Sequence, residues 1–214
     1  MKVLIINGSP NVNGNTFVGA KIISNVLKEH NIDSEIYSLG NKVFKPCTAC
    51  RACFKNKDFK CVIHDDLNDL IEKCLVFDGL VLGSPIHFAD VSGLIKNALD
   101  RLFYVSAANN NIFYHKVGAA YTVVRRSGGI AGFHTLNNYL MYAEMFIAGS
   151  SYWNVVHGQK PEEAYADKEG VQTLETLADN LAYLLKIIDT STIEEPKRRP
   201  KVGTNFVRED LLTD

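Results

Sequence analysis

Apolar residues occur in short continuous runs that alternate with stretches in which they recur at helical spacing. The clearest continuous runs are Val3–Ile6, Leu80–Leu82 and Val117–Val124. Such uninterrupted, partly β-branched runs predict strands that are buried on both faces, as in a parallel sheet. Weaker strands are expected at Ser34–Leu39 and Tyr152–Val156.

Helical spacing follows most of these strands. It predicts helices over 16–31, 91–102, 136–145 and 171–188, with a short amphipathic helix that carries Leu67, Leu70, Ile71 and Cys74. Strands that alternate with helices imply right-handed βαβ units. We therefore predict an α/β fold, a flavodoxin-like doubly wound sheet of five parallel strands in the order 2-1-3-4-5, with helices on both faces.

The composition changes after Ile188. Residues 1–189 are expected to form the α/β domain, and 190–214 a C-terminal tail with two prolines and a basic run, Lys197-Arg198-Arg199. The tail is interpreted either as a solvated end or as a dimer arm that contacts a partner subunit through Phe206, Val207 and Leu211.

Composition narrows the function classes. The 214 residues carry 23 Lys and Arg against 24 Asp and Glu, a formal net charge of -1. This charge argues against a nucleic-acid or anionic-membrane binder that relies on a basic field. No apolar run approaches the ~20 residues that span a bilayer, and no secretory signal is evident. We expect a cytoplasmic protein with a small-molecule partner.

A glycine-rich loop links the first strand to the first helix. Its sequence is Gly8-Ser-Pro-Asn-Val-Asn-Gly-Asn-Thr16. Free N–H groups and the helix dipole at such a position favour an anion, and Ser9, Asn11, Asn13, Asn15 and Thr16 add neutral donors. Neither a Gly-Lys-Ser/Thr nor a Gly-x-Gly-x-x-Gly pattern is present. The loop predicts a phosphate site, with an ordinary βα turn as the alternative.

Two further loops follow the next central strands. Gly83-Ser-Pro-Ile-His-Phe88 offers backbone edges and an apolar wall to a flat ligand, through Pro85, Ile86, His87 and Phe88. Arg125-Arg-Ser-Gly-Gly129 adds further donors. Because ligands of open α/β sheets bind beyond the carboxyl ends of the strands, these loops are expected to share one site.

These motifs, together with Gly149-Ser-Ser-Tyr-Trp-Asn154, resemble the NAD(P)H-dependent FMN reductase branch of the flavodoxin-like flavoproteins from Lys2 to about Ile188. The resemblance implies an FMN phosphate at Ser9, Asn11, Asn15 and Thr16. It places the isoalloxazine ring at Pro85, Ile86, His87 and Phe88, with the ring edge at Arg126, Ser127 and Gly128. Many relatives carry a basic residue where this chain has Asn11, so phosphate binding here would rely on backbone N–H groups.

The resemblance also implies the reaction. Hydride would pass from NAD(P)H to FMN and then to a quinone, azo, nitro or flavin acceptor, with the flavin supplying the redox chemistry. Backbone donors near the ring would stabilise developing charge, and no catalytic side chain is expected. Simple members of the branch are homodimers whose flavin site is partly closed by the second subunit.

Four of the five cysteines lie close together in the sequence. Cys47, Cys50 and Cys53 are separated by two-residue gaps, and Cys61 follows after seven residues. Such spacing allows thiolates to converge on a [4Fe–4S] cluster, and it is similar to the motif of iron–sulfur flavoproteins. Zinc and free or redox-active thiols remain open, and Cys74 is expected in the core.

The sequence leaves two functions in competition. The first is an FMN enzyme that reduces a small acceptor. The second is an iron–sulfur flavoprotein or flavodoxin-like carrier that relays single electrons. Carriers commonly use a one-sign surface to steer encounters, and the net charge of -1 favours the enzyme. A regulatory module on the same fold has no positive feature in its support.

Overall fold

The centre of the computed structural model, which describes residues 1–203, is a parallel sheet. Its strands are β1 (Lys2–Asn7), β2 (Asp33–Ser38), β3 (Gly79–His87), β5 (Val117–Val124), β6 (Phe146–Ile147) and β7 (Val155–His157). They lie in the order β2-β1-β3-β5, and β6 and β7 both pair with β5. The five predicted strands correspond to β1, β2, β3, β5 and β7 and take the predicted order 2-1-3-4-5.

The last position of the sheet is an interrupted strand. β6 pairs with Val117 and Gly118 at the start of β5, whereas β7 pairs with Thr122 to Val124 at its end. The chain leaves the sheet between them, and Asn154 bridges back by donating its side-chain N–H to the Ala120 carbonyl oxygen at 2.8 Å. The interruption exposes the aromatic pair Tyr152 and Trp153.

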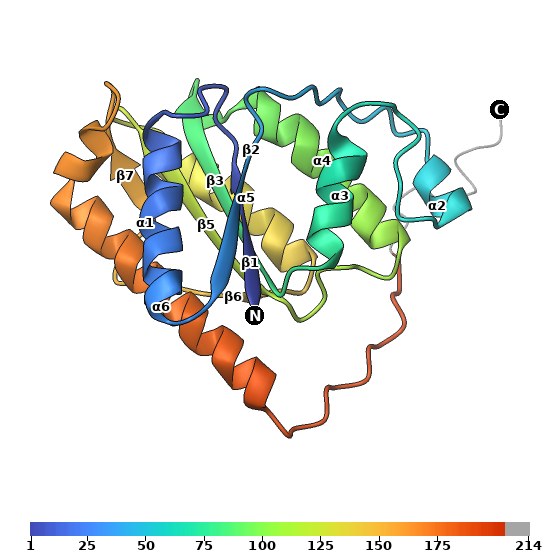
Figure 1. Ribbon diagram of the computed structural model, residues 1–214. Coiled ribbons are helices and arrows are strands. Elements are labelled where there is room, and N and C mark those ends of the chain that lie inside the picture. The colour runs from blue at the N-terminus through green and yellow to red at the C-terminus, as the bar shows by residue number, and fades with distance from the viewer. Residues whose placement is uncertain (204–214) are drawn as a thin grey trace.

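Helices cover both faces of the sheet (Figure 1). One core cluster joins the sheet to α1 (Asn15–Glu29) and α6 (Lys168–Thr190). The other joins it to α3 (Leu67–Leu75), α4 (Gly93–Ala108) and α5 (Gly129–Tyr142). The four residues predicted for the buried stripe of the short helix, Leu67, Leu70, Ile71 and Cys74, are all buried in this second cluster.

Four small elements lie outside the predicted pattern. They are α2 (Ala52–Asn56) inside the cysteine loop, the two-residue strands β4 (Asp90–Val91) and β6, and a short 3₁₀ helix, Glu163–Ala166. In addition, β3 continues through Gly83-Ser-Pro-Ile-His87, which the sequence predicts as loop. Pro85 is accommodated because it pairs only with β5; β1 ends opposite Gly83. An edge position without a ladder N–H suits proline.

The first part of the tail returns along its own domain. After α6 the chain runs past the amino-end side of the sheet toward the end of α4 (Figure 1). Arg198 donates to the Asn110 carbonyl oxygen at 2.8 Å and pairs with Glu144, and Lys201 donates to the Tyr142 hydroxyl at 3.2 Å. Phe206, Val207 and Leu211, which were predicted for a dimer arm, lie outside the described residues. Among the helices of residues 1–203, none is long and apolar enough to cross a membrane.

Candidate functional site

The glycine-rich loop is fixed against β3 and α4. The Gly8 N–H donates to the Gly83 carbonyl oxygen at 2.8 Å, and the Ser92 hydroxyl donates to the Gly8 carbonyl oxygen at 2.7 Å. A Cβ at Gly8 would lie 2.6 Å from Ile95 Cδ1 and 2.9 Å from the Gly83 oxygen. The close approach of the two loops therefore requires glycine at this position.

Several polar groups of the glycine-rich loop already make hydrogen bonds within the protein. Ser9 Oγ accepts the Asn11 N–H at 3.1 Å, and Asn11 Oδ1 accepts the Asn13 N–H at 3.2 Å. The Asn15 side chain donates to the Lys160 carbonyl oxygen at 2.8 Å and accepts the Ala164 N–H at 3.2 Å. Asn15 thus holds the loop after β7 to the start of α1, and these contacts use its side-chain oxygen and one of its two side-chain N–H donors.

Other donors of the loop remain available. The backbone N–H groups of Val12, Asn15 and Thr16 have no acceptor within residues 1–203. Gly14 precedes α1 without a side-chain cap, so the positive end of the helix dipole is uncompensated there. The side chains of Asn11 and Asn13 are exposed, whereas Ser9 and Thr16 are buried.

The end of β3 forms a tight hairpin with β4 at the same edge of the sheet. Phe88 and Ala89 connect the two strands with φ values of 50° and 68°. Two successive positive φ angles are typical of the hairpin turns whose twist matches the strands, although they strain residues other than glycine. The turn leaves His87 exposed and the Phe88 ring fully exposed, with Pro85 and Ile86 half-buried below them.

The loop after β5 packs against this hairpin. Gly128 immediately precedes α5 and has a φ of 89°, and a Cβ there would lie 2.9 Å from Ala89 Cα. Arg126 and Ser127 are exposed beside it. The predicted ring-binding residues of β3 and the predicted ring-edge residues after β5 therefore lie next to each other.

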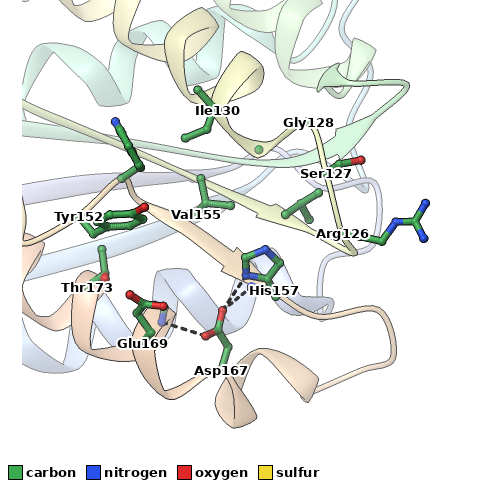
Figure 2. A pocket seen from close by; sticks show the side chains of 14 residues that line it. Arg126, Ser127, Gly128, Ile130, Tyr152, Val155, His157, Asp167, Glu169 and Thr173 are labelled. Atoms are coloured by element: carbon green, nitrogen blue, oxygen red, sulfur yellow. Dashed lines mark hydrogen bonds and ion pairs between the residues drawn. The ribbon is translucent and has the colours of Figure 1, made fainter.

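A cavity of about 340 Å³ adjoins the β5 loop (Figure 2). Arg126, Ser127 and Gly128 line it, but the residues of the first loop and of the β3–β4 hairpin do not. Its remaining walls come from the start of α5, the segment around β7 and the start of α6. Several lining residues were not predicted as site residues, although the motif Gly149–Asn154 includes the first two of them: Tyr152, Trp153, His157, Asp167, Glu169 and Thr173.

Asp167 organises one wall of this cavity (Figure 2). Its carboxylate accepts the Gly170 N–H at 3.0 Å, which caps α6, and the His157 N–H at 2.7 Å. It also lies 3.1 Å from His157 Nδ1. Burial opposes the charged form, but these hydrogen bonds and the His157 ring lower the pKa of Asp167 below its usual value. The sequence signal that could have pointed to Asp167 is its position between β7, the last strand, and the first turn of α6.

The four clustered cysteines surround a second, much smaller cavity of about 20 Å³. Cys47 and Cys50 are exposed, Cys61 is half-buried and Cys53 is buried. Ala49, Arg51 and Lys57 adopt positive φ angles, which fold the loop around α2. Asn68 of α3 fixes Cys61 by accepting its N–H at 2.9 Å and donating to its carbonyl oxygen at 3.0 Å. As predicted, Cys74 lies apart in the core.

This arrangement bears on which metal group the thiols could hold. Among residues 1–203, no three His, Cys, Asp or Glu side chains converge closely enough to hold a single metal ion. A zinc site of thiolates needs such convergence. In a [4Fe–4S] cluster each cysteine binds a different iron, so the sulfur ligands stand further apart around a common centre. Four thiols that line one cavity supply the number of ligands that such a cluster takes, whereas among the described residues they do not form a single-ion site.

Comparison with known proteins supports the fold and defines the family. Residues 1–160 match the family described as NADPH-dependent FMN reductase. An iron–sulfur flavoprotein of Methanocaldococcus jannaschii is 30% identical over 195 residues, which cover 88% of this chain and 99% of that protein. An FMN-dependent NADPH-azoreductase of Staphylococcus aureus is 32% identical over 138 residues, 64% of this chain and 66% of that protein.

The solved structure of an archaeal flavodoxin superposes with a TM-score of 0.57 at 17% identity, covering 87% of this chain and 99% of that one. Sheet order, helical layers and this superposition define a flavodoxin-like α/β protein. The chain belongs to the NADPH-dependent FMN reductase family, whose members similar to it include iron–sulfur flavoproteins. It is accordingly an oxidoreductase and a flavoprotein.

Proposed function

We propose that this protein binds FMN at the carboxyl edge of its sheet and uses NAD(P)H to reduce a small acceptor of the quinone, azo, nitro or flavin type. The observation that carries the proposal is the group of unpaired N–H donors of Val12, Asn15 and Thr16 at the start of α1. They follow β1, which pairs with β3, the strand that leads into the hairpin carrying Phe88. When bound, FMN supplies the redox chemistry.

The residues of the chain bind and orient the cofactor in this proposal. The N–H groups of Val12, Asn15 and Thr16 hold the phosphate, with Ser9, Asn11 and Asn13 shaping the loop. Pro85, Ile86, His87 and Phe88 form the wall for the ring, and the backbone from Arg126 to Gly128 donates to its edge. The 340 Å³ cavity beside Arg126, with its exposed Tyr152 and Trp153, is open to the nicotinamide or the acceptor.

The charge at position 11 provides the first test. The exposed Asn11→Lys variant should bind FMN about 1.4- to 5-fold more tightly and Asn11→Glu more weakly by a similar factor, the range expected for an exposed charge pair of about 0.2–1 kcal/mol. The difference should shrink at high salt. Quenching of flavin fluorescence during titration measures both affinities. Thr192→Lys makes the same charge change beyond the far end of α6 (Figure 1) and should leave the affinity unchanged.

Two results of this titration would contradict the proposal. A parent protein that binds no FMN would overturn the function as a whole. Equal affinities for the Asn11→Lys and Asn11→Glu variants at low salt would remove the phosphate from this loop. Rapid-mixing reduction with NADH and NADPH then separates an enzyme from a carrier, because a carrier without a nicotinamide site is reduced slowly by both.

We further propose that the cysteine loop holds a [4Fe–4S] cluster and that the protein can relay single electrons. Two findings support it: Cys47, Cys50, Cys53 and Cys61 surround one cavity, and the 30% identical relative that matches 88% of this chain is an iron–sulfur flavoprotein. A bound cluster supplies one-electron transfer. The thiols bind it, and α2, α3 and α4 hold the loop that carries them.

Replacement of one thiol tests the cluster. After anaerobic reconstitution with iron and sulfide, the parent protein should contain both in equal amounts and show a broad absorbance that dithionite bleaches. Cys50→Ser should lose most of the bound iron because the exposed Cys50 is one of the four ligands. The matched variant Cys74→Ala removes a core thiol outside the cavity and should retain the iron. Equal iron contents in the two variants would contradict the assignment.

We also propose that the chain forms a homodimer in which 1–189 is the folding domain and 190–214 an extension. The fully exposed Phe88 ring beside the proposed flavin site supports a second subunit there, since large exposed apolar side chains at a site mark contact surfaces.

A further inference from the structure

A buried ion pair lies directly beneath the cysteine loop. Arg101 of α4 donates to Asp65 Oδ2 at 2.5 Å, and the two side chains are only 1% and 2% exposed. The same guanidinium donates to the Lys45 carbonyl oxygen at 3.1 Å and to the Ile63 carbonyl oxygen at 3.2 Å. Every donor and acceptor named here is thus contributed by α4 or by the two ends of the loop.

These contacts tie the loop together at its base. Lys45 lies two residues before Cys47, and Ile63 lies two residues after Cys61. Asp65 reinforces the join because its Oδ2 also accepts the Lys45 N–H at 2.9 Å. One side chain of a helix therefore closes the segment that carries all four thiols, and arginine suits this role because its planar fork presents five donors.

The Nε atom of Arg101 takes no part in these contacts. This atom is buried and has no hydrogen-bond acceptor among the described residues. Arg101 lines the cavity that Cys47, Cys50, Cys53 and Cys61 surround. A buried N–H without an acceptor is costly, and the groups in this cavity that gain acceptor strength when they ionise are the thiols.

We propose that Arg101 is the positioning and charge-compensating residue of the cluster site, with its free Nε–H reserved for a sulfur of the bound cluster. This inference rests on the proposed function. The guanidinium of Arg101 stays charged in the interior, whereas four thiolates give the cluster site a negative charge. Reduction by one electron from reduced FMN adds one further negative charge to the cluster, with no proton or bond change at Arg101. The buried cation stabilises the reduced form more than the oxidised one, so it raises the reduction potential.

Removal of this charge is the direct test. In the anaerobically reconstituted full chain, Arg101→Gln should shift the reduced-to-oxidised ratio at a fixed potential at least tenfold toward the oxidised form. Tenfold corresponds to 59 mV for a one-electron couple. A spectroscopic redox titration measures the shift. The matched control Lys55→Gln removes one positive charge from exposed α2 in the same loop, where water and salt screen it, and should shift the ratio less than twofold.

A second variant separates the effect of the positive charge from the effect of the guanidinium's several hydrogen bonds. Arg101→Lys keeps the charge but cannot reach all the carbonyl groups, so we expect a potential close to that of the parent and several-fold faster loss of iron to a chelator. A parent-like potential in Arg101→Gln, or an equal shift in Lys55→Gln, would overturn the inference.

If Arg101→Gln does not fold, Asp65→Asn tests the inference instead. That variant retains the cation and removes its counter-charge, so it should raise the potential; a fall or no change would overturn the inference. A parent protein that takes up no cluster would overturn the proposed cluster function together with this inference. By contrast, a loaded parent whose potential ignores Arg101 would overturn this inference alone.

Discussion

Replacing Asp65 with alanine should lower the free energy of unfolding by about 3–5 kcal/mol, the cost of leaving a buried charge unpaired. Arg101 would keep its charge at 1% side-chain exposure without its counter-ion. The N–H groups of Lys45 and Leu67, which Asp65 accepts at 2.9 and 3.2 Å, would lose their acceptor as well. Urea unfolding monitored by circular dichroism measures the change.

Asp65→Asn is the matched variant for this prediction. It retains the size of the side chain and one acceptor oxygen, so its cost should be clearly smaller than that of Asp65→Ala. An alanine variant that loses less than about 1 kcal/mol, the level of an exposed ion pair, would show that the pair contributes no more than a surface contact.

Acidification should remove the same stabilisation gradually. Burial alone would raise the pKa of Asp65, but hydrogen bonds from Arg101 and from the Lys45 and Leu67 N–H groups lower it below the usual value. The stabilisation is therefore complete above the pKa of an unfolded aspartate, about 3.9, and is lost as the pH falls through the lower pKa of the folded protein. Asp65→Ala should flatten this acid limb of the stability curve.

Gly83→Ala should destabilise the protein by about 2–4 kcal/mol, combining overpacking with the loss of a buried hydrogen bond. A Cβ at this position would lie 2.3 Å from Tyr121 Cζ and 2.4 Å from its hydroxyl oxygen. Tyr121 is fully buried, and its hydroxyl donates to the Thr16 carbonyl oxygen at 2.6 Å. Displacement of the ring would disturb the first turn of α1, so FMN affinity should fall together with stability.

Two further variants test this steric explanation. Gly93→Ala introduces the same group where no atom lies within 4 Å and should be nearly neutral. Tyr121→Val removes the ring that causes the clash, so the double variant with Gly83→Ala should be more stable than the sum of the single changes predicts, as expected for residues in contact. Additive unfolding energies would contradict the explanation.

The fold could be predicted where the pattern of apolar residues had one interpretation. The eight-residue run Val117–Val124 is β5 in full, because a strand buried on both faces is predominantly apolar and all eight residues are buried. Other boundaries depend on tertiary contacts. Val91 continues the apolar spacing of α4, but it belongs to β4 and pairs with Ile86 of β3. The helix begins only after Ser92, which caps it by accepting the Ile95 N–H.

The candidate site was predictable to the level of loops but not of individual side chains. The glycine-rich loop after β1 and the hairpin turn after β3 lie at one edge because parallel strands end there. The sequence did not indicate that Asn15 is engaged by Lys160 and Ala164, since these lie about 145 residues away in the chain. The His157–Asp167 pair was missed for a similar reason: it forms only when the start of α6 packs beside β7.

Helix α4 connects the two ends of the proposed electron path. Ser92 at its start holds the glycine-rich loop, and Arg101 in its middle holds the cysteine loop. Nine residues at a rise of 1.5 Å place these two anchors about 13 Å apart along one rigid rod. The spacing of the two loops is thus set by helix geometry, and insertion of a single residue between the anchors would rotate one loop by about 100° relative to the other.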